Sequence, residues 1–112
     1  MISQVLLFVL MAAPASGGTG GARQAYAKCV RMMMVTDLKA KTAADAFQAK
    51  LATACQAELS TFKTISVNAD VAAGIRRASA EQNANDDAAD MVSSAADRYK
   101  EYLETNTLPQ HE

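Results

Sequence analysis

The side chains with the most reactive chemistry in this sequence are sulfur groups. Two cysteines, Cys29 and Cys55, could form a structural disulfide or a redox-active dithiol. Three consecutive methionines, Met32–Met34, closely follow the first cysteine, so thiol and thioether ligands could together form a soft site suited to Cu(I). The choice among these three chemistries depends on how the surrounding chain positions the sulfur atoms.

The spacing of the sulfur residues argues against redox and metal chemistry. A dithiol oxidoreductase typically carries Cys-x-x-Cys, whereas these cysteines lie 26 positions apart. Consecutive residues of a helix project about 100° apart, so Met32, Met33 and Met34 cannot all face one ion. Met33 and Met34 instead fit an apolar face, where methionine fills irregular gaps. We therefore expect no metal and no cofactor.

The elements that carry these residues are predicted to be helices. Alanine, the strongest helix former, is the commonest residue, and no proline or glycine interrupts residues 22–73. No segment shows the alternating β-branched pattern of a strand. A first helix is predicted over about 23–38, because its apolar residues recur at helical spacing on one face. These residues are Tyr26, Cys29, Val30, Met33 and Met34.

A second helix is predicted from about Thr42 to Lys63. Its apolar face carries Ala44, Phe47, Leu51, Cys55, Leu59 and Phe62. If the two helices form an antiparallel hairpin that turns at residues 40–42, Cys29 and Cys55 lie nearly level and face each other. We therefore predict a Cys29–Cys55 disulfide. The chain-entropy model gives such a bridge about 3.5 kcal/mol of stability for the 25 intervening residues.

A long third helix is predicted from Asn68 or Asp70 to about Glu104. Its seam alternates steps of four and three residues through Val71, Ile75, Ala78, Gln82, Asn85, Ala89, Val92, Ala96, Tyr99 and Leu103. Residues 81–87 are polar on every face, so either one helix crosses solvent there or it breaks into two; we favour one continuous helix. The predicted fold is all-α: a disulfide-linked antiparallel helical hairpin with one long third helix.

The first residues have the pattern of an export signal. A short polar start is followed by the apolar run Val5–Ala13 and by the small residues Ala13-Pro14-Ala15, which suit signal-peptide cleavage. The run is shorter than the roughly 20 apolar residues that span a bilayer, so no stable membrane span is expected after cleavage. The protein is therefore expected to be exported, either periplasmic or secreted. The predicted divisions are a signal peptide over 1–15, a flexible glycine-rich linker over 16–22, a helical domain over 23–104 and a disordered tail over 105–112.

Charge and residue types exclude several classes of function. Residues 22–65 carry seven basic and three acidic side chains, and residues 66–112 carry four basic and nine acidic ones, which fits two halves that pack with complementary surfaces. The basic half lacks interleaved aromatic residues, so no nucleic-acid partner is expected. His111 is the only histidine and lies beyond Pro109, which argues against histidine-based triads and multi-histidine zinc sites. No enzyme activity is predicted.

Glu58 lies near one edge of the apolar face predicted for the second helix. On a helical projection it falls between Phe47 and Leu51, where a carboxylate needs a partner or access to water. The cations available to it are Arg31, Arg76 and Arg77. We predict a buried structural ion pair between Glu58 and one of these arginines.

Two short stretches carry a resemblance to a known group of proteins. "YAKCV" (26–30) and "ACQAEL" (54–59), after a signal-like start, resemble small exported two-cysteine helical proteins of Gram-negative bacteria. The resemblance implies an exported helical domain with a bridge between the two cysteines, and it implies no activity. The Leu-Thr-rich repeats of the helical periplasmic chaperones do not occur in this sequence.

The function expected from these patterns is non-enzymatic binding or a structural role in the cell envelope, with a protein or an envelope component as the partner. From Ser16 onward only 18 residues are Val, Ile, Leu, Met or Phe, which makes a thin core. Two chains paired along residues 71–103 would bury more apolar surface than one, so we also predict a homodimer through the third helix. The alternative is a periplasmic stress or holdase-like chaperone that uses the concave apolar side of the hairpin.

Overall fold

The structure, a computed structural model, describes residues 18–110. The predicted signal peptide, residues 1–15, lies outside this range. Most of the described chain forms four helices: α1 Gly18–Lys39, α2 Ala44–Leu51, α3 Gln56–Ala72 and α4 Arg77–Thr105. No strand occurs between residues 18 and 110, so the all-α fold class is confirmed.

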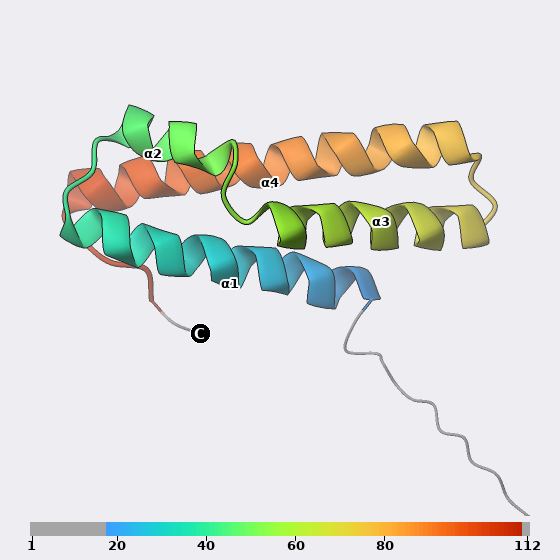
Figure 1. The fold of residues 1–112 in the computed structure, drawn as a ribbon, viewed down its shortest axis with the longest axis horizontal. Coiled ribbons are helices and arrows are strands. Elements are labelled where there is room, and N and C mark those ends of the chain that lie inside the picture. The colour runs from blue at the N-terminus through green and yellow to red at the C-terminus, as the bar shows by residue number, and fades with distance from the viewer. Residues whose placement is uncertain (1–17, 111–112) are drawn as a thin grey trace, which may run out of the picture.

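The helices lie side by side in an elongated arrangement (Figure 1). α1 and α4 run in the same direction, and α2 followed by α3 runs back in the opposite direction. α3 packs against both α1 and α4, whereas α2 packs on α4. Among the main helix pairs, α1 and α4 have the sparsest contact, so these two parallel helices are held together largely through their neighbours.

The prediction of a single second helix over 42–63 is wrong, because the structure divides this segment into α2 and α3. Residues 52–55 form a turn, and Cys55 adopts a left-handed conformation with φ 57° immediately before α3. The division lets α2 lie on α4 while α3 contacts both α1 and α4. The turn has the sequence Ala-Thr-Ala-Cys, which contains no glycine or proline, so helix propensity does not reveal the break.

The long helix predicted to begin at Asn68 or Asp70 begins instead at Arg77. Gly74, with φ 98°, turns the chain between α3 and α4. The N–H of Ile75 donates to the carbonyl oxygen of Asp70 at 3.0 Å, which is the long hydrogen bond of a Schellman motif. Glycine adopts this φ without steric cost, so it ends the helix here rather than weakening its interior.

α4 is continuous through residues 81–87, so the helix does not break there. Its buried face carries Ala80, Ala84, Ala88, Ala95 and Tyr99. The predicted seam is out of phase in this region, because Ala78, Gln82 and Asn85 are exposed. The small alanines pack with Val67 of α3, so the polar stretch lies against another helix and does not cross open solvent. A search for large apolar residues misses a seam made of alanine.

α1 begins at Gly18, inside the segment predicted as a flexible linker over 16–22. Ala22 is buried, and the guanidinium of Arg23 lies over the Phe62 ring at 4.9 Å from its centroid. The linker prediction is therefore wrong from residue 18 onward. Contacts with α3 stabilise a glycine-rich first turn that would be a poor helix alone.

The prediction of a disordered tail over 105–112 also differs from the structure in the described part. Thr105 is the last residue of α4, and the chain then turns back toward the middle of the molecule (Figure 1). Pro109 is half-buried, and together with Gln110 it borders a cavity beside α1 and α4. The tail therefore forms part of a surface that the helices alone do not complete.

Tyr99 joins three segments at one end of the core. Its ring stacks on that of Phe47, and its hydroxyl donates to the carbonyl oxygen of Thr42 at 2.5 Å. In the same region Lys50 Nζ lies 2.7 Å from Oδ1 of Asp37, whose side chain is buried. These contacts connect the end of α1, helix α2 and helix α4.

Candidate ligand-binding groove

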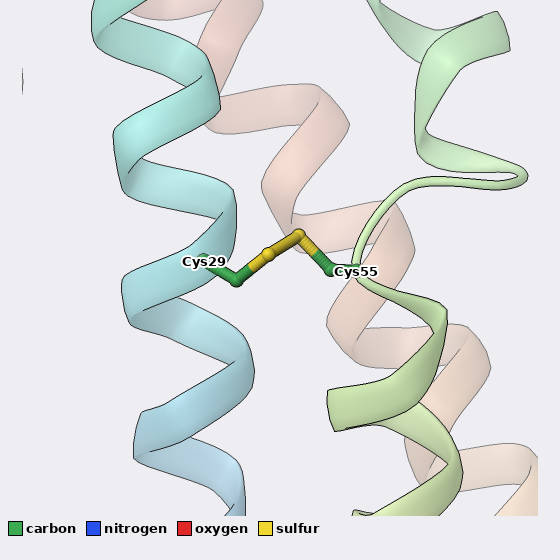
Figure 2. The surroundings of a disulfide bond; sticks show 2 residues. All are labelled: Cys29 and Cys55. Atoms are coloured by element: carbon green, nitrogen blue, oxygen red, sulfur yellow. A yellow bond between two sulfur atoms is a disulfide. The ribbon is translucent and has the colours of Figure 1, made fainter.

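The predicted disulfide between Cys29 and Cys55 is confirmed. The two sulfur atoms lie 2.04 Å apart and the Cα atoms 6.0 Å apart. Figure 2 shows the bridge running from the middle of α1 to the residue that precedes α3. It therefore joins α1 to the turn that divides α2 from α3.

The three methionines separate as helical geometry requires. Met34 is buried at 3% exposure, Met33 is partly buried, and Met32 is 63% exposed. They do not converge on one point. Their placement matches the interpretation of Met33 and Met34 as core residues.

Within residues 18–110, Glu58 forms no ion pair with Arg31, Arg76 or Arg77, so that prediction is wrong. Its carboxylate lies within 4.8 Å of both disulfide sulfurs, and the ion pair that the structure contains joins Lys50 to Asp37. Glu58 belongs to the first turn of α3, where the free N–H groups and the helix dipole favour a negative charge. Arg76 and Arg77, two of the proposed partners, lie beyond the far end of α3. The local helix terminus therefore accounts for this carboxylate without an arginine.

A groove lies between α1 and α4 on the described surface. It has a volume of about 420 Å³, within the range of small-ligand sites. Its floor is apolar and consists of Val30, Met34, Met91 and Ala95. Its more exposed rim carries Arg23 and Arg31 from α1, and Asp90, Ser94 and Arg98 from α4.

Helical periodicity explains how the rim forms. Arg23 and Arg31 are eight residues apart on α1, and Asp90 and Arg98 are eight residues apart on α4. Residues at this spacing lie on one face about 12 Å apart along the axis. Since α1 and α4 run in the same direction, the two polar rows follow the same groove.

The ends of α1 and α4 fix the register of the two rows. Lys41 Nζ donates to Oδ1 of Asn106 at 3.4 Å, just beyond the last residues of these helices. Arg31 lies ten residues before Lys41, and Arg98 lies eight residues before Asn106. With the usual rise per residue, Arg31 and Arg98 are level to within about one helical turn, roughly 5 Å.

The charges on the rim are unevenly balanced. By the same register, Arg23 is level with Asp90, whereas Arg31 is level with the like charge of Arg98. None of the three arginines forms an ion pair within the described residues. Two guanidinium groups on facing rims, with no carboxylate between them, produce a positive potential that an anion would neutralise.

Tyr26 adds an unused hydrogen-bond donor to the groove. Its side chain is 2% exposed and lines the groove, and its hydroxyl has no hydrogen-bond partner in the described chain. Burial raises the pKa of this phenol, so it stays protonated and able to donate. A buried donor without a partner costs about 1–3 kcal/mol, which makes this hydroxyl the least satisfied group of the groove.

The sequence pattern does not reveal this groove, although several of its residues carry other predictions. Tyr26 was predicted as part of an apolar face, and Arg31 as a partner of Glu58. Arg23 and Arg98 carried no signal of their own, because each is one basic residue on an amphipathic helix. The placement of these arginines along one groove becomes evident only once α1 and α4 are known to be parallel neighbours.

The fold and the groove together define a disulfide-linked all-α protein with a positively charged groove that has a partly apolar lining. No protein-family model matches the chain, and comparisons with curated proteins and with solved structures give no significant match either. Among the helices of residues 18–110, none is both long and apolar enough to cross a membrane.

Proposed function

We propose that this protein is a non-enzymatic binding protein of the cell envelope, which holds an anionic ligand in the groove between α1 and α4. The observation that carries the proposal is that Arg31 and Arg98 lie at the same height along a groove that Tyr26, with its unpaired hydroxyl, also lines. The groove thus combines positive charge, an unused donor and an apolar floor. Such a combination suits a ligand with an anionic group and an apolar part.

The chemistry of the rim supports binding rather than proton transfer. A guanidinium group donates several hydrogen bonds and does not give up its proton in proteins. Arg31 and Arg98 are therefore suited to orient an anion and unsuited to act as a base. Their planar donor groups fit carboxylate and phosphate oxygens in paired hydrogen bonds.

The location in the envelope is supported by two independent features. Residues 1–15 have the pattern of an export signal. The disulfide between Cys29 and Cys55 is of the kind that persists in oxidising compartments such as the periplasm or the exterior of the cell. We propose a periplasmic or secreted protein on these grounds.

Native mass spectrometry of the exported protein tests the proposal. The protein should carry or take up one anionic molecule from a panel of carboxylates, phosphates and sulfates. The double variant Arg31→Gln/Arg98→Gln should lose at least tenfold in affinity, because each lost hydrogen bond to a charged group is worth about 1.5–3 kcal/mol. Lys100→Gln, an exposed charge on α4 that does not line the groove, serves as the matched control. Equal binding by all three proteins, or binding of no anion at all, would overturn the proposal.

The homodimer through residues 71–103 stays a prediction. The alanine face of α4 packs against α3 within one chain, so a second copy would need another face of the helix. Sedimentation equilibrium over a range of concentrations decides between one chain and two.

A further inference from the structure

We infer that the ligand of the groove is the C-terminal end of a peptide chain with apolar last residues, bound through its free carboxylate. This inference rests on the proposed function and specifies the ligand. It follows from two polar subsites at different depths of one groove, separated by an apolar floor. A plain fatty acid matches only the first subsite.

The first subsite is the level pair Arg31 and Arg98. A terminal carboxylate offers two oxygens, so each guanidinium can donate to it from its own side of the groove. The other end of the groove is electrically balanced, because Arg23 lies level with Asp90 and also stacks over Phe62. The net attraction for a single negative charge is therefore strongest between Arg31 and Arg98.

The second subsite is the hydroxyl of Tyr26. Tyr26 lies five residues before Arg31 on α1, which is about 7.5 Å along the axis. The Cα–Cβ bonds of both residues lean toward the start of the helix, so the two polar groups keep roughly this spacing along the axis. An extended peptide advances about 3.3–3.6 Å per residue, so the hydroxyl is level with a backbone carbonyl two or three residues before the terminus.

The region between the subsites fits apolar side chains. Val30 and Ala95 are buried, and Met91 is half-buried beside them. Methionine adapts its shape to different apolar groups, so this floor tolerates more than one side chain. If each non-hydrogen atom fills the ~30 Å³ of a liquid water, the groove of about 420 Å³ holds roughly 14 such atoms, the size of about two residues.

The alternative occupant, an unbranched fatty acid, leaves the Tyr26 hydroxyl unsatisfied. Its chain has no acceptor at the distance of the second subsite, so the hydroxyl would remain a buried donor without a partner. A peptide supplies a carbonyl acceptor at each residue. The two ligands therefore differ in whether Tyr26 contributes to affinity.

The probe peptide is acetyl-Ala-Ala-Leu with a free carboxylate, and its C-terminal amide is the matched ligand without the charge. Chemical shifts of the ¹⁵N-labelled exported protein should give a dissociation constant of about 1 mM or lower for the acid, as expected when roughly 14 atoms of the ligand fit in the groove. The amide should bind at least tenfold more weakly. Decanoate is the fatty-acid probe, and its size is close to the roughly 14 atoms that the groove holds.

Three variants locate the interaction. Arg98→Gln should weaken the acid peptide at least tenfold, and Lys100→Gln should change its affinity less than twofold. Tyr26→Phe should weaken the peptide about threefold to tenfold and leave decanoate unchanged, because only the peptide accepts from the hydroxyl. Thermal melts of all variants confirm that each is folded.

The outcomes separate this inference from the proposed function. Suppose that Arg98→Gln weakens the binding of decanoate or of a phosphate, but that the acid and amide peptides bind with equal affinity. The peptide inference is then overturned, and the proposed anion-binding function stands. Equal weakening of peptide and decanoate by Tyr26→Phe would also overturn the inference. If no anion binds saturably, both fail.

Discussion

The rings of Phe47 and Tyr99 lie parallel, with 3.9 Å between their centroids and 5° between their planes. Both side chains are fully buried. The hydroxyl of Tyr99 extends beyond this stack and donates to the carbonyl oxygen of Thr42. Tyr99 of α4 therefore contacts α2 through its ring, and it contacts the segment after α1 through its hydroxyl.

The two contacts of Tyr99 can be separated by substitution. Tyr99→Phe keeps the stacked ring and removes the donor to Thr42, so we expect a loss of about 1 kcal/mol in the free energy of unfolding. Tyr99→Ala also removes the ring and should cost about 3–5 kcal/mol. Urea unfolding measures both. Tyr102→Phe, the same change at a half-buried tyrosine of α4, should cost less than about 0.5 kcal/mol. A loss as large as that of Tyr99→Phe would contradict the assignment.

The disulfide should supply a large part of the stability of this small domain. Reduction of the Cys29–Cys55 bridge, or the double variant Cys29→Ser/Cys55→Ser, should lower the free energy of unfolding by about 3.5 kcal/mol. The oxidised protein should also weigh two hydrogens less than the reduced protein. Met32→Ser, a change at a 63% exposed position of α1, is the control. Equal masses with and without reductant would refute the bridge.

The free energy of unfolding should fall at alkaline pH. Burial raises the pKa of Tyr26 and of Tyr99 above the ordinary value of 10.0, and the nearby charge of Asp37 raises that of Tyr99 further. The unfolded chain therefore loses these protons first. Stability is complete below about pH 10 and declines toward the raised folded pKa, by at most about 1.4 kcal/mol per pH unit for each phenol.

Urea unfolding between pH 8 and pH 11 measures this slope. The double variant Tyr26→Phe/Tyr99→Phe should show a flatter dependence than the parent, whatever its stability at pH 8. An identical slope in both proteins would show that these phenols do not carry the effect.

Tyr26→Phe should leave the protein as stable as the parent or raise its free energy of unfolding by about 1 kcal/mol. The substitution removes a buried hydroxyl that has no partner within the described chain and keeps the ring in the core. The contrast with Tyr99→Phe, where the hydroxyl is bonded, makes the two variants controls for each other. A loss above 1 kcal/mol in Tyr26→Phe would reveal a structural hydrogen bond and weaken the case for a ligand-binding role.

The features that were predictable from sequence depend on local pattern or on a single pairing. Alanine content and the absence of alternating β-branched residues indicate helices, whatever their packing. The disulfide was predictable because two cysteines allow one pairing, and because both fall on the apolar faces predicted for two helices of an antiparallel hairpin. Its prediction survived an incorrect boundary, since Cys55 reaches α1 from a turn rather than from within a helix.

The features that were missed depend on tertiary contact. The turn at residues 52–55 contains no helix breaker, so it is stabilised by what α2 and α3 each contact. Gly74 lies inside the third helix predicted from Asn68 or Asp70, although it forms the turn between two helices. The alanine seam at Ala80 and Ala84 carries little hydrophobic signal. The groove requires knowledge of which helices are parallel neighbours, and the spacing of Arg31 and Arg98 along the chain does not provide it.

The bridge also changes how the protein responds to force. Cys29 and Cys55 enclose 25 residues, which include all of α2. When the chain is pulled from both ends, this closed loop cannot extend while the disulfide is intact, so the fully stretched length is shorter by about 85 Å. Tension passes directly from the middle of α1 to the start of α3 and leaves out the segment between them. The stacked ring of Phe47 lies inside that sheltered loop, and so do the groove residues Val30, Arg31 and Met34, whereas the groove wall formed by α4 carries the load.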